Sequence, residues 1–279
     1  MEYLKKSWHQ TWNSIKKHRV LFIILVILQV LFVVSSLTLG VHYLLKILEN
    51  VQGIAGPLEE ANYDAQKIEQ GEAFTPDYAA IYNSYQAMLK NAFSFLLWMS
   101  AIFLALNGSM WLLSHWMLQE AKEWRVKRKE GAQFLLKAWI SALVLLGSFM
   151  VVSYFVLLYF IRISPSFNNI IGVLKALLGV FVIIHYFFVV ALAVAPFSPW
   201  KLISTWMHTS VRNFRKTASL YLIVAAALLA SFVALYQAIQ YGQSVILLLA
   251  LGLLSIVLVT VSRIFWIAGI QEIQQEIKR

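Results

Sequence analysis

The chain contains no cysteine, and no acidic residue falls inside its long apolar stretches. Without cysteine there can be no disulfide, no thiolate nucleophile and no cysteine-ligated metal or iron–sulfur site. All 13 Asp and Glu residues lie in terminal or connecting segments. Proton relays and cation coupling in membrane proteins usually recruit carboxylates within the spans. The distribution of acids therefore argues against ion-coupled transport and against acid–base catalysis within a bilayer.

Charge is scarce in this chain and apolar residues are abundant. Charged residues make up 13% of the sequence and hydrophobic residues 60%, whereas a soluble domain usually carries about 25% charged residues. A net charge of +10 on a soluble fold would suggest nucleic acid as the partner. Here the basic residues flank apolar stretches, so we expect an anionic lipid surface as the partner and no nucleic acid.

Several stretches are long enough to cross a bilayer, which requires about 20 apolar residues. The last uncharged run, Thr217–Ser262, would be about 69 Å long as one helix, so we predict that it folds back within the polar segment Gln237–Ser244. None of the five prolines falls inside a span. The predicted fold class is all-α: one polytopic membrane domain, 1–279, a bundle of six transmembrane helices at 20–45, 92–118, 134–161, 170–195, 218–236 and 245–270.

Basic residues set the predicted orientation, because cytoplasmic loops carry an excess of Lys and Arg. With the N-terminus inside, 18 of the 23 Lys and Arg residues fall in inner segments and 5 in outer segments. We therefore predict a multi-pass protein of the plasma membrane with both termini in the cytoplasm. The residues expected to contact anionic lipids of the inner leaflet are Lys16, Lys17, Arg19, Lys127, Arg128, Lys129, Arg212, Arg215 and Lys216.

Residues 46–90 form the one sizeable outer segment. Pro57 is predicted to open a helix and Gly71 to close it, because proline favours the first turn and glycine the position after the last. Thr75 is the predicted cap of a second helix that starts at Pro76 and leads into the second span. We predict a small helical hairpin that packs on the bundle; the alternative is a docking site for an extracytoplasmic partner.

Four polar residues lie at a similar depth within the predicted spans. Gln29, Asn107 and His185 are each about ten residues from the inner end of their helix, hence about 15 Å deep, and Thr260 lies at a similar depth. Polar side chains in hydrocarbon need hydrogen-bonding partners. These residues either bond one another and fix the helix packing, or they line a polar pathway or a small binding site at the midplane. The sequence leaves both interpretations open.

No catalytic, cofactor or metal site is predicted. His42, His115 and His185 lie at three different depths, so they cannot meet at one metal. The triplet Asn107–Ser109 invites comparison with rhomboid-type serine proteases, but Met110 stands where their Gly-x-Ser-Gly turn requires glycine. His115 also lies about 9 Å from that serine along the same helix. No phosphate loop, paired carboxylates or metal-protease motif occurs, so we expect a protein that is not an enzyme.

The segment that leads into the fifth span has a recognisable composition. Residues 196–201 read Pro-Phe-Ser-Pro-Trp-Lys, and residues 210–216 read Ser-Val-Arg-Asn-Phe-Arg-Lys. This segment resembles the inner loop of a group of six-helix prokaryotic membrane proteins of unknown function. That group includes the membrane domain found ahead of glycerophosphodiester phosphodiesterases and its stand-alone relatives. The resemblance implies a six-helix membrane fold and carries over no catalytic residue, since the sequence holds no phosphodiesterase domain.

The layout also resembles the six-helix permeases of export-type ABC transporters. An amphipathic N-terminal helix over residues 3–18 precedes the first span, and the charged connector 120–137 could act as a coupling helix. We therefore expect a non-enzymatic scaffold or a subunit of a larger membrane assembly, with protein partners in the membrane. The alternative is the membrane subunit of a transporter energised by a separate ATPase.

Overall fold

The computed structural model describes residues 2–60, 77–118, 167–194 and 208–278, together with isolated helical positions between 133 and 155. Every element within these residues is a helix. Five helical stretches are long and apolar enough to cross a membrane: Arg19–Glu59, Tyr78–Leu118, Lys175–Ala193, Phe214–Gln240 and Val245–Glu276. The span predicted at 134–161 lies outside the described residues except for isolated positions such as the exposed Leu136 and Phe155. The protein is therefore a helical membrane protein with several spans.

The chain divides into two compact units, which are described separately. The bundle unit consists of Met1–Gln29 and Gly108–Arg279, and the hairpin unit consists of Val30–Asn107. The boundary at Gln29 falls inside a continuous helix, α2. The boundary at Asn107 falls where a π-helical segment meets an α-helix.

The hairpin unit contains α4 (Tyr78–Ile102) and the part of α2 (Arg19–Glu60) from Val30 onward. The expectation that Pro57 starts a helix is wrong, because Pro57 lies inside α2, in the last turn of that helix. A proline there removes one backbone hydrogen bond, and only a few residues of helix remain beyond it. The two helices approach closely at Gly53, where an added Cβ would lie 2.5 Å from Ser84 Oγ.

The start of α4 also differs from the prediction, which placed the cap at Thr75. The cap is Asp77, whose Oδ1 accepts a hydrogen bond from the Ala80 amide at 2.9 Å. A carboxylate satisfies a free amide of the first turn and also complements the positive end of the helix dipole, which favours it over a hydroxyl. The predicted helix end at Gly71 lies outside the described residues.

The second predicted span contains three consecutive helical segments. Helix α4 leads into a π-helix, η1 (Phe103–Asn107), and then into α5 (Gly108–Leu118). Short π-helical segments insert an extra residue into a helix and occur often at functional sites. Asn107, one of the predicted midplane residues, is the last residue of this segment.

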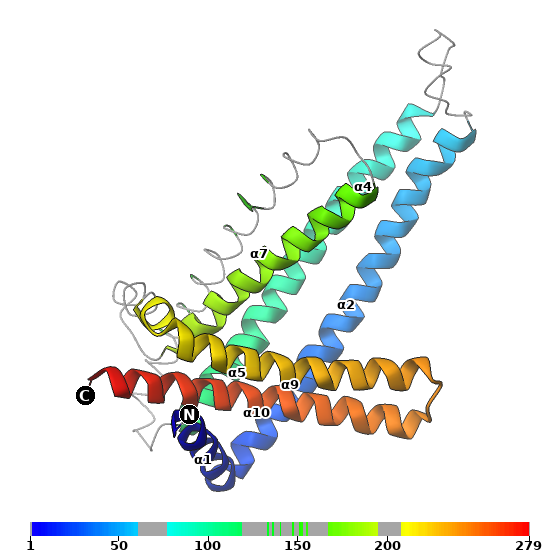
Figure 1. Cartoon of the computed structure of the whole chain (residues 1–279). Coiled ribbons are helices and arrows are strands. Elements are labelled where there is room, and N and C mark those ends of the chain that lie inside the picture. The colour runs from blue at the N-terminus through cyan, green and yellow to red at the C-terminus, as the bar shows by residue number, and fades with distance from the viewer. Residues whose placement is uncertain are drawn as a thin grey trace. The chain divides into compact units, whose positions relative to one another are not determined.

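The bundle unit is organised around one central helix, α10 (Val245–Lys278). Four helices contact it: α1 (Glu2–Lys17), α5, α7 (Phe167–Ala193) and α9 (Phe214–Gln240). Helices α9 and α10 run antiparallel, side by side (Figure 1). A second π-helix, η2 (His208–Arg212), precedes α9.

The predicted fold-back between α9 and α10 is confirmed. Gly242 adopts a φ of 61°, and its amide donates to the Ile239 carbonyl at 3.1 Å. The Gln243 amide donates to the Ala238 carbonyl, also at 3.1 Å. This pair of bonds is a Schellman motif, which requires a left-handed residue just after the helix and therefore favours glycine. Ser244 then caps α10, because its Oγ accepts from the Leu247 amide at 3.4 Å.

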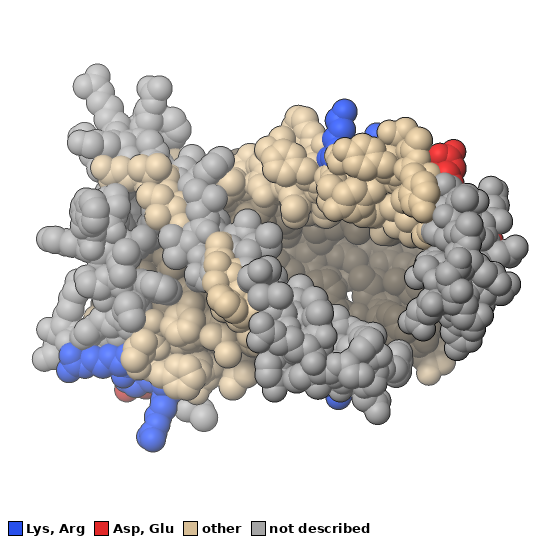
Figure 2. Space-filling model, turned by 90° about the horizontal axis from the view of Figure 1, so that it is seen from above, with Lys and Arg blue, Asp and Glu red and all other residues tan. Residues whose placement is uncertain are grey.

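The hydrophobic core of the bundle unit lies at one end of its helices. It combines the end of α7, the start of α9 and the last third of α10, with Trp111 of α5. At Gly269 in α10 the packing is tight, because an added Cβ would collide with Leu220 Cδ2 of α9. The opposite ends of α9 and α10 are open, with Leu229 65% and Ile246 81% exposed. Most of the described surface in Figure 2 belongs to uncharged residues.

Candidate functional site

Arg263 is the chemically most unusual residue in the bundle unit. It lies within α10, about 27 Å along the helix from Val245, after a run of 18 uncharged residues. Its side chain is 8% exposed, and it is the only buried Lys or Arg among the described residues. Ionisable residues within membrane spans are rare and usually functional, so Arg263 is the natural starting point for a candidate site.

Two side chains from other helices hold the guanidinium of Arg263. Its Nη2 donates a hydrogen bond to Oε1 of Gln29 in α2 at 2.7 Å. Its central carbon lies 5.8 Å from the ring centroid of Trp111 in α5, which is a cation–π contact. A hydrogen bond to a charged group contributes about 1.5–3 kcal/mol, and a desolvated cation–π contact about 2 kcal/mol. All three residues belong to the bundle unit, so together they join α2, α5 and α10.

Within the described part of the chain, the contacts of Arg263 leave one of its donors unpaired. Nη1 of Arg263 is buried and has no hydrogen-bond partner among the described residues. The chain places no carboxylate in any predicted span, and a guanidinium does not lose its proton in proteins. A buried donor left unpaired costs about 1–3 kcal/mol, more when it is charged. The site therefore holds a positive charge at a cost to stability, which is typical of functional residues in membranes.

The four predicted midplane residues do not hydrogen-bond one another in the described contacts. Gln29 is buried and bonds Arg263. Thr260 lies one turn before Arg263 and is fully buried, but its Oγ1 donates to the Ile256 carbonyl of its own helix at 3.0 Å. Asn107 belongs to the hairpin unit and is described apart from the others. The predicted set therefore contributes one residue, Gln29, to a polar contact between helices at this site.

His185, the fourth predicted midplane residue, has a different partner. Its Nδ1 lies 2.9 Å from the hydroxyl oxygen of Tyr221 in α9, and the Phe181 ring stacks on the imidazole at 6.0 Å. The side chain is exposed on the described surface. This contact joins α7 to α9 and is separate from the contacts of Arg263.

A second group of polar contacts fixes the end of α7. The last carbonyls of a helix lack partners within the helix, and a side chain of another helix supplies one here. Nε2–H of His115 in α5 donates to the Leu192 carbonyl at 2.8 Å. Nε1–H of Trp266 in α10 donates to the Val189 carbonyl at 3.0 Å. These contacts tie α7 to α5 and α10 at the core end of the unit.

Tyr186 links α7 to the segment that starts α9. Its hydroxyl donates to the Ser210 carbonyl at 3.1 Å and lies 2.6 Å from Thr217 Oγ1. The Tyr221 ring packs edge-on against it, with centroids 5.5 Å apart. Residues 210–217 belong to the loop on which the family resemblance rested, and in the structure they anchor three elements to one another.

The residues predicted to contact anionic lipids have varied surroundings. Lys216 forms an ion pair with the carboxylate of Glu276 in α10. Lys16 lies with its Nζ 5.5 Å from the ring centroid of Trp12. The exposed members of the set are Lys16, Lys17, Arg19, Arg212, Arg215 and Lys216. The remaining three, Lys127, Arg128 and Lys129, lie outside the described residues.

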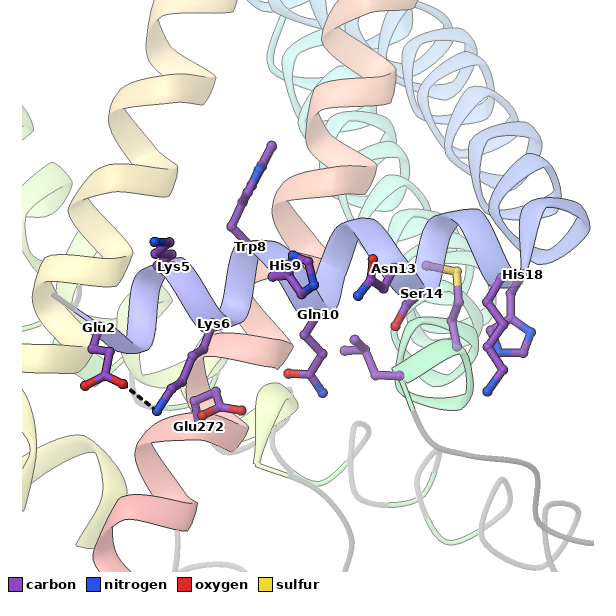
Figure 3. A pocket seen from close by; sticks show the side chains of 13 residues that line it. Glu2, Lys5, Lys6, Trp8, His9, Gln10, Asn13, Ser14, His18 and Glu272 are labelled. Atoms are coloured by element: carbon purple, nitrogen blue, oxygen red, sulfur yellow. Dashed lines mark ion pairs between the residues drawn. The ribbon is translucent and has the colours of Figure 1, made fainter.

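A cavity of ≈ 940 Å³ lies beside α1 (Figure 3). Polar residues of α1 line most of it, and Met117 and Leu118 of α5 and Glu272 of α10 complete it. Glu2 and Lys6 form an ion pair of 2.9 Å at its edge. The hydrogen bond and charge of Lys6 lower the pKa of the Glu2 carboxyl, so the pair stays ionised at neutral pH.

Sequence reasoning missed Arg263 as a site residue. It was counted among the inner-segment cations that orient the chain, although it falls within the span predicted at 245–270. Its position between Ser262 and Ile264, inside an apolar helix, is the signal that could have identified it. The partner could not be identified in the same way, because Gln29 is 234 residues away in the sequence.

Comparison with known proteins adds no assignment. No family model matches the chain, and no curated protein or solved structure matches it either. Within the described residues, no group of three or more His, Asp or Glu side chains could hold a metal ion. The proposed function therefore rests on the contacts between the helices.

Proposed function

We propose that this chain is a non-enzymatic, multi-pass subunit of a larger assembly in the plasma membrane, with six spans and both termini in the cytoplasm. The observation that supports this proposal is the division of the bundle unit into a packed end and an open apolar end. Polar side chains at the packed end join helix to helix, and the opposite halves of the helices offer apolar surface to lipid and to partner helices.

The open end is extensive. Leu229 and Tyr236 of α9 are 65% and 60% exposed, and Ile246 and Leu249 of α10 are 81% and 65% exposed. A soluble monomer rarely exposes so large a contiguous apolar surface. In a bilayer, lipid tails cover such a surface, and helices of other subunits replace the lipid through close packing and interhelical hydrogen bonds.

The polar contacts at the packed end suit a scaffold. Tyr186, His115 and Trp266 each donate a hydrogen bond to a backbone carbonyl of another segment. Hydrogen bonds of this kind between membrane helices contribute about 0.6–2 kcal/mol each. Their effect is to hold helices in fixed positions, which is what a subunit needs in order to present a constant surface.

The ends of the chain support the proposed orientation. Tyr3 bonds the backbone of Lys216, and Lys216 pairs with Glu276 near the C-terminus. Both ends of the chain therefore lie at the packed end of the bundle unit (Figure 1). The basic residues at the ends of α1 and before α9 gather there too, as the positive-inside rule requires of a cytoplasmic side.

The proposal is tested by purification of the native protein in mild detergent, followed by mass spectrometry and determination of the mass of the complex. We expect at least one other membrane protein to co-purify in a fixed ratio. An unrelated six-span protein from the same membranes, purified in parallel, identifies the background. A preparation that contains this chain alone, at the mass of one copy, contradicts the proposal.

A second candidate function is supported by Arg263. A fixed, incompletely compensated cation inside the membrane would attract an anionic substrate, as expected for the permease subunit of a transporter energised by a separate ATPase. A nucleotide-hydrolysing subunit among the co-purified proteins, with its ATPase activity stimulated by this chain, would favour the permease. Loss of that stimulation in Arg263→Gln, but not in a control variant Arg215→Gln, would assign the role to the buried cation.

A further inference from the structure

Helix α1 turns its hydroxyl side chains toward the bundle. Its buried residues are Tyr3, Ser7 and Thr11, which recur every fourth position and share one face. Ser7 Oγ donates to the Tyr3 carbonyl at 2.6 Å, and Thr11 Oγ1 donates to the Ser7 carbonyl at 2.8 Å. The Ser7 and Thr11 hydroxyls are therefore satisfied within α1, while Leu4 of the same helix packs against the hydrophobic core.

The two tryptophan side chains of α1 are exposed instead. Trp8 is 55% exposed and Trp12 is 49% exposed. Trp8 and Lys5 project from one side of the helix, whereas Glu2, Lys6 and Gln10 project from the other (Figure 3). Because indole combines a large apolar ring with an N–H donor, tryptophan prefers the interface between membrane and water.

Helix α1 lies near the end of a span because a short linker joins it to α2. One residue, His18, separates the last residue of α1, Lys17, from the first residue of α2, Arg19. The Trp8 ring meets Phe265 of α10 edge-on, with centroids 6.0 Å apart. Helix α1 therefore lies where two spanning helices, α2 and α10, converge at the packed end of the bundle unit.

The charge on the aromatic side is positive. Lys16 lies over the Trp12 ring, and Lys5 lies beside Trp8. Lys5, Lys16 and Lys17 form no ion pair with a described residue, whereas the acid Glu2 is already paired with Lys6. Exposed tryptophan beside lysine that has no ion pair among the described residues matches the headgroup region of an anionic leaflet, since each lysine near such a surface attracts it by about 1 kcal/mol.

We propose that α1 is a membrane-surface anchor: Trp8 and Trp12 insert at headgroup level, while Lys5 and Lys16 bind the phosphates of anionic phospholipids. The opposite side, with Gln10 and Asn13, faces the cytoplasm. This inference rests on the proposed membrane orientation and goes beyond it by assigning the lipid contact to one side of one helix. The bilayer then covers aromatic surface that the protein itself leaves open.

The test uses the absence of cysteine, because a single introduced cysteine becomes the only labelling site. An environment-sensitive fluorophore is placed at Trp12→Cys and, as the matched control, at the adjacent exposed Asn13→Cys. The full-length protein is reconstituted into vesicles with equal amounts of phosphatidylcholine and phosphatidylglycerol. We expect a nitroxide-bearing lipid to quench the label at position 12 several-fold more than the label at position 13. Equal quenching at the two positions overturns the proposal.

A third label separates this inference from the proposed membrane residence. Leu229→Cys places the fluorophore on the open part of α9, where lipid should quench it strongly. Strong quenching at 229 with none at 12 refutes only the anchor, whereas no quenching at 229 refutes the membrane residence itself.

The charge is tested with the double variant Lys5→Gln and Lys16→Gln. It should lower the ratio of inserted to free α1 by about fivefold per lysine in anionic vesicles and leave it unchanged in pure phosphatidylcholine.

Discussion

Arg263 Nη2 donates to Gln29 Oε1 across 2.7 Å, and this bond joins the start of α2 to α10. A buried charge that loses its partner is strongly destabilising, whereas removal of both polar groups can be neutral. We expect Gln29→Leu to lower the free energy of unfolding by about 2 kcal/mol. The double variant Gln29→Leu with Arg263→Met should recover most of that loss. Thermal unfolding in detergent measures both effects, and strictly additive changes would show that the two residues are not coupled.

A side chain at Gly269 is expected to destabilise the protein. A Cβ at this position collides with the fully buried Leu220, so Gly269→Ala should cost about 1–3 kcal/mol. Gly252 lies in the same helix with nothing within 4 Å of an added Cβ. Gly252→Ala is therefore the matched control, and it should stabilise the helix by about 0.5–1 kcal/mol. Shifts of the unfolding temperature in the same direction for both variants would contradict this expectation.

Cysteine accessibility tests the predicted number of spans. With six spans and the N-terminus inside, Ser244→Cys in the α9–α10 turn should react with an impermeant maleimide added to intact cells. Lys17→Cys at the end of α1 should react only after the membrane is opened. With five spans these two positions would lie on the same side, because a span would be missing between them. Labelling of both from the outside, or of neither, would therefore remove the span predicted at 134–161.

The attachment of α1 should depend on pH through Tyr3. Burial raises the pKa of the Tyr3 phenol above its ordinary value of 10.0. Its contribution to stability is therefore fully present below that value and is lost as the pH rises through the higher pKa of the folded state. Protease cleavage within α1 should accelerate in that alkaline range, and Tyr3→Phe should show a smaller change. An identical pH profile for the two proteins would contradict this role.

Hydropathy predicted the five described spanning helices but located their ends less reliably. The spans predicted at 20–45 and 92–118 belong to α2 and to the α4–η1–α5 stretch, both of which extend beyond the apolar run. Helices continue into polar sequence as long as no stronger local signal ends them, and Pro57 was not such a signal. The turn at Gly242 was predictable, because a polar glycine-containing segment between two apolar runs has few other structures available.

The candidate site was only partly predictable. Gln29 was identified by its depth, which follows from its distance along one helix. Its partner Arg263 was not identified, because depth says nothing about the direction in which a side chain points around the helix axis. The same holds for His185, which bonds Tyr221 rather than another midplane residue.

The sequence by itself determined that this protein is helical and resides in a membrane, since apolar length and the placement of charge are local properties that any fold must respect. Tertiary structure alone decided that Arg263 meets Gln29 and Trp111, and that the two tryptophans of α1 stay about half exposed. Those relationships depend on how helices rotate and pack against distant neighbours. Packing between segments 234 residues apart in the chain is decided by the shapes of all the helices together.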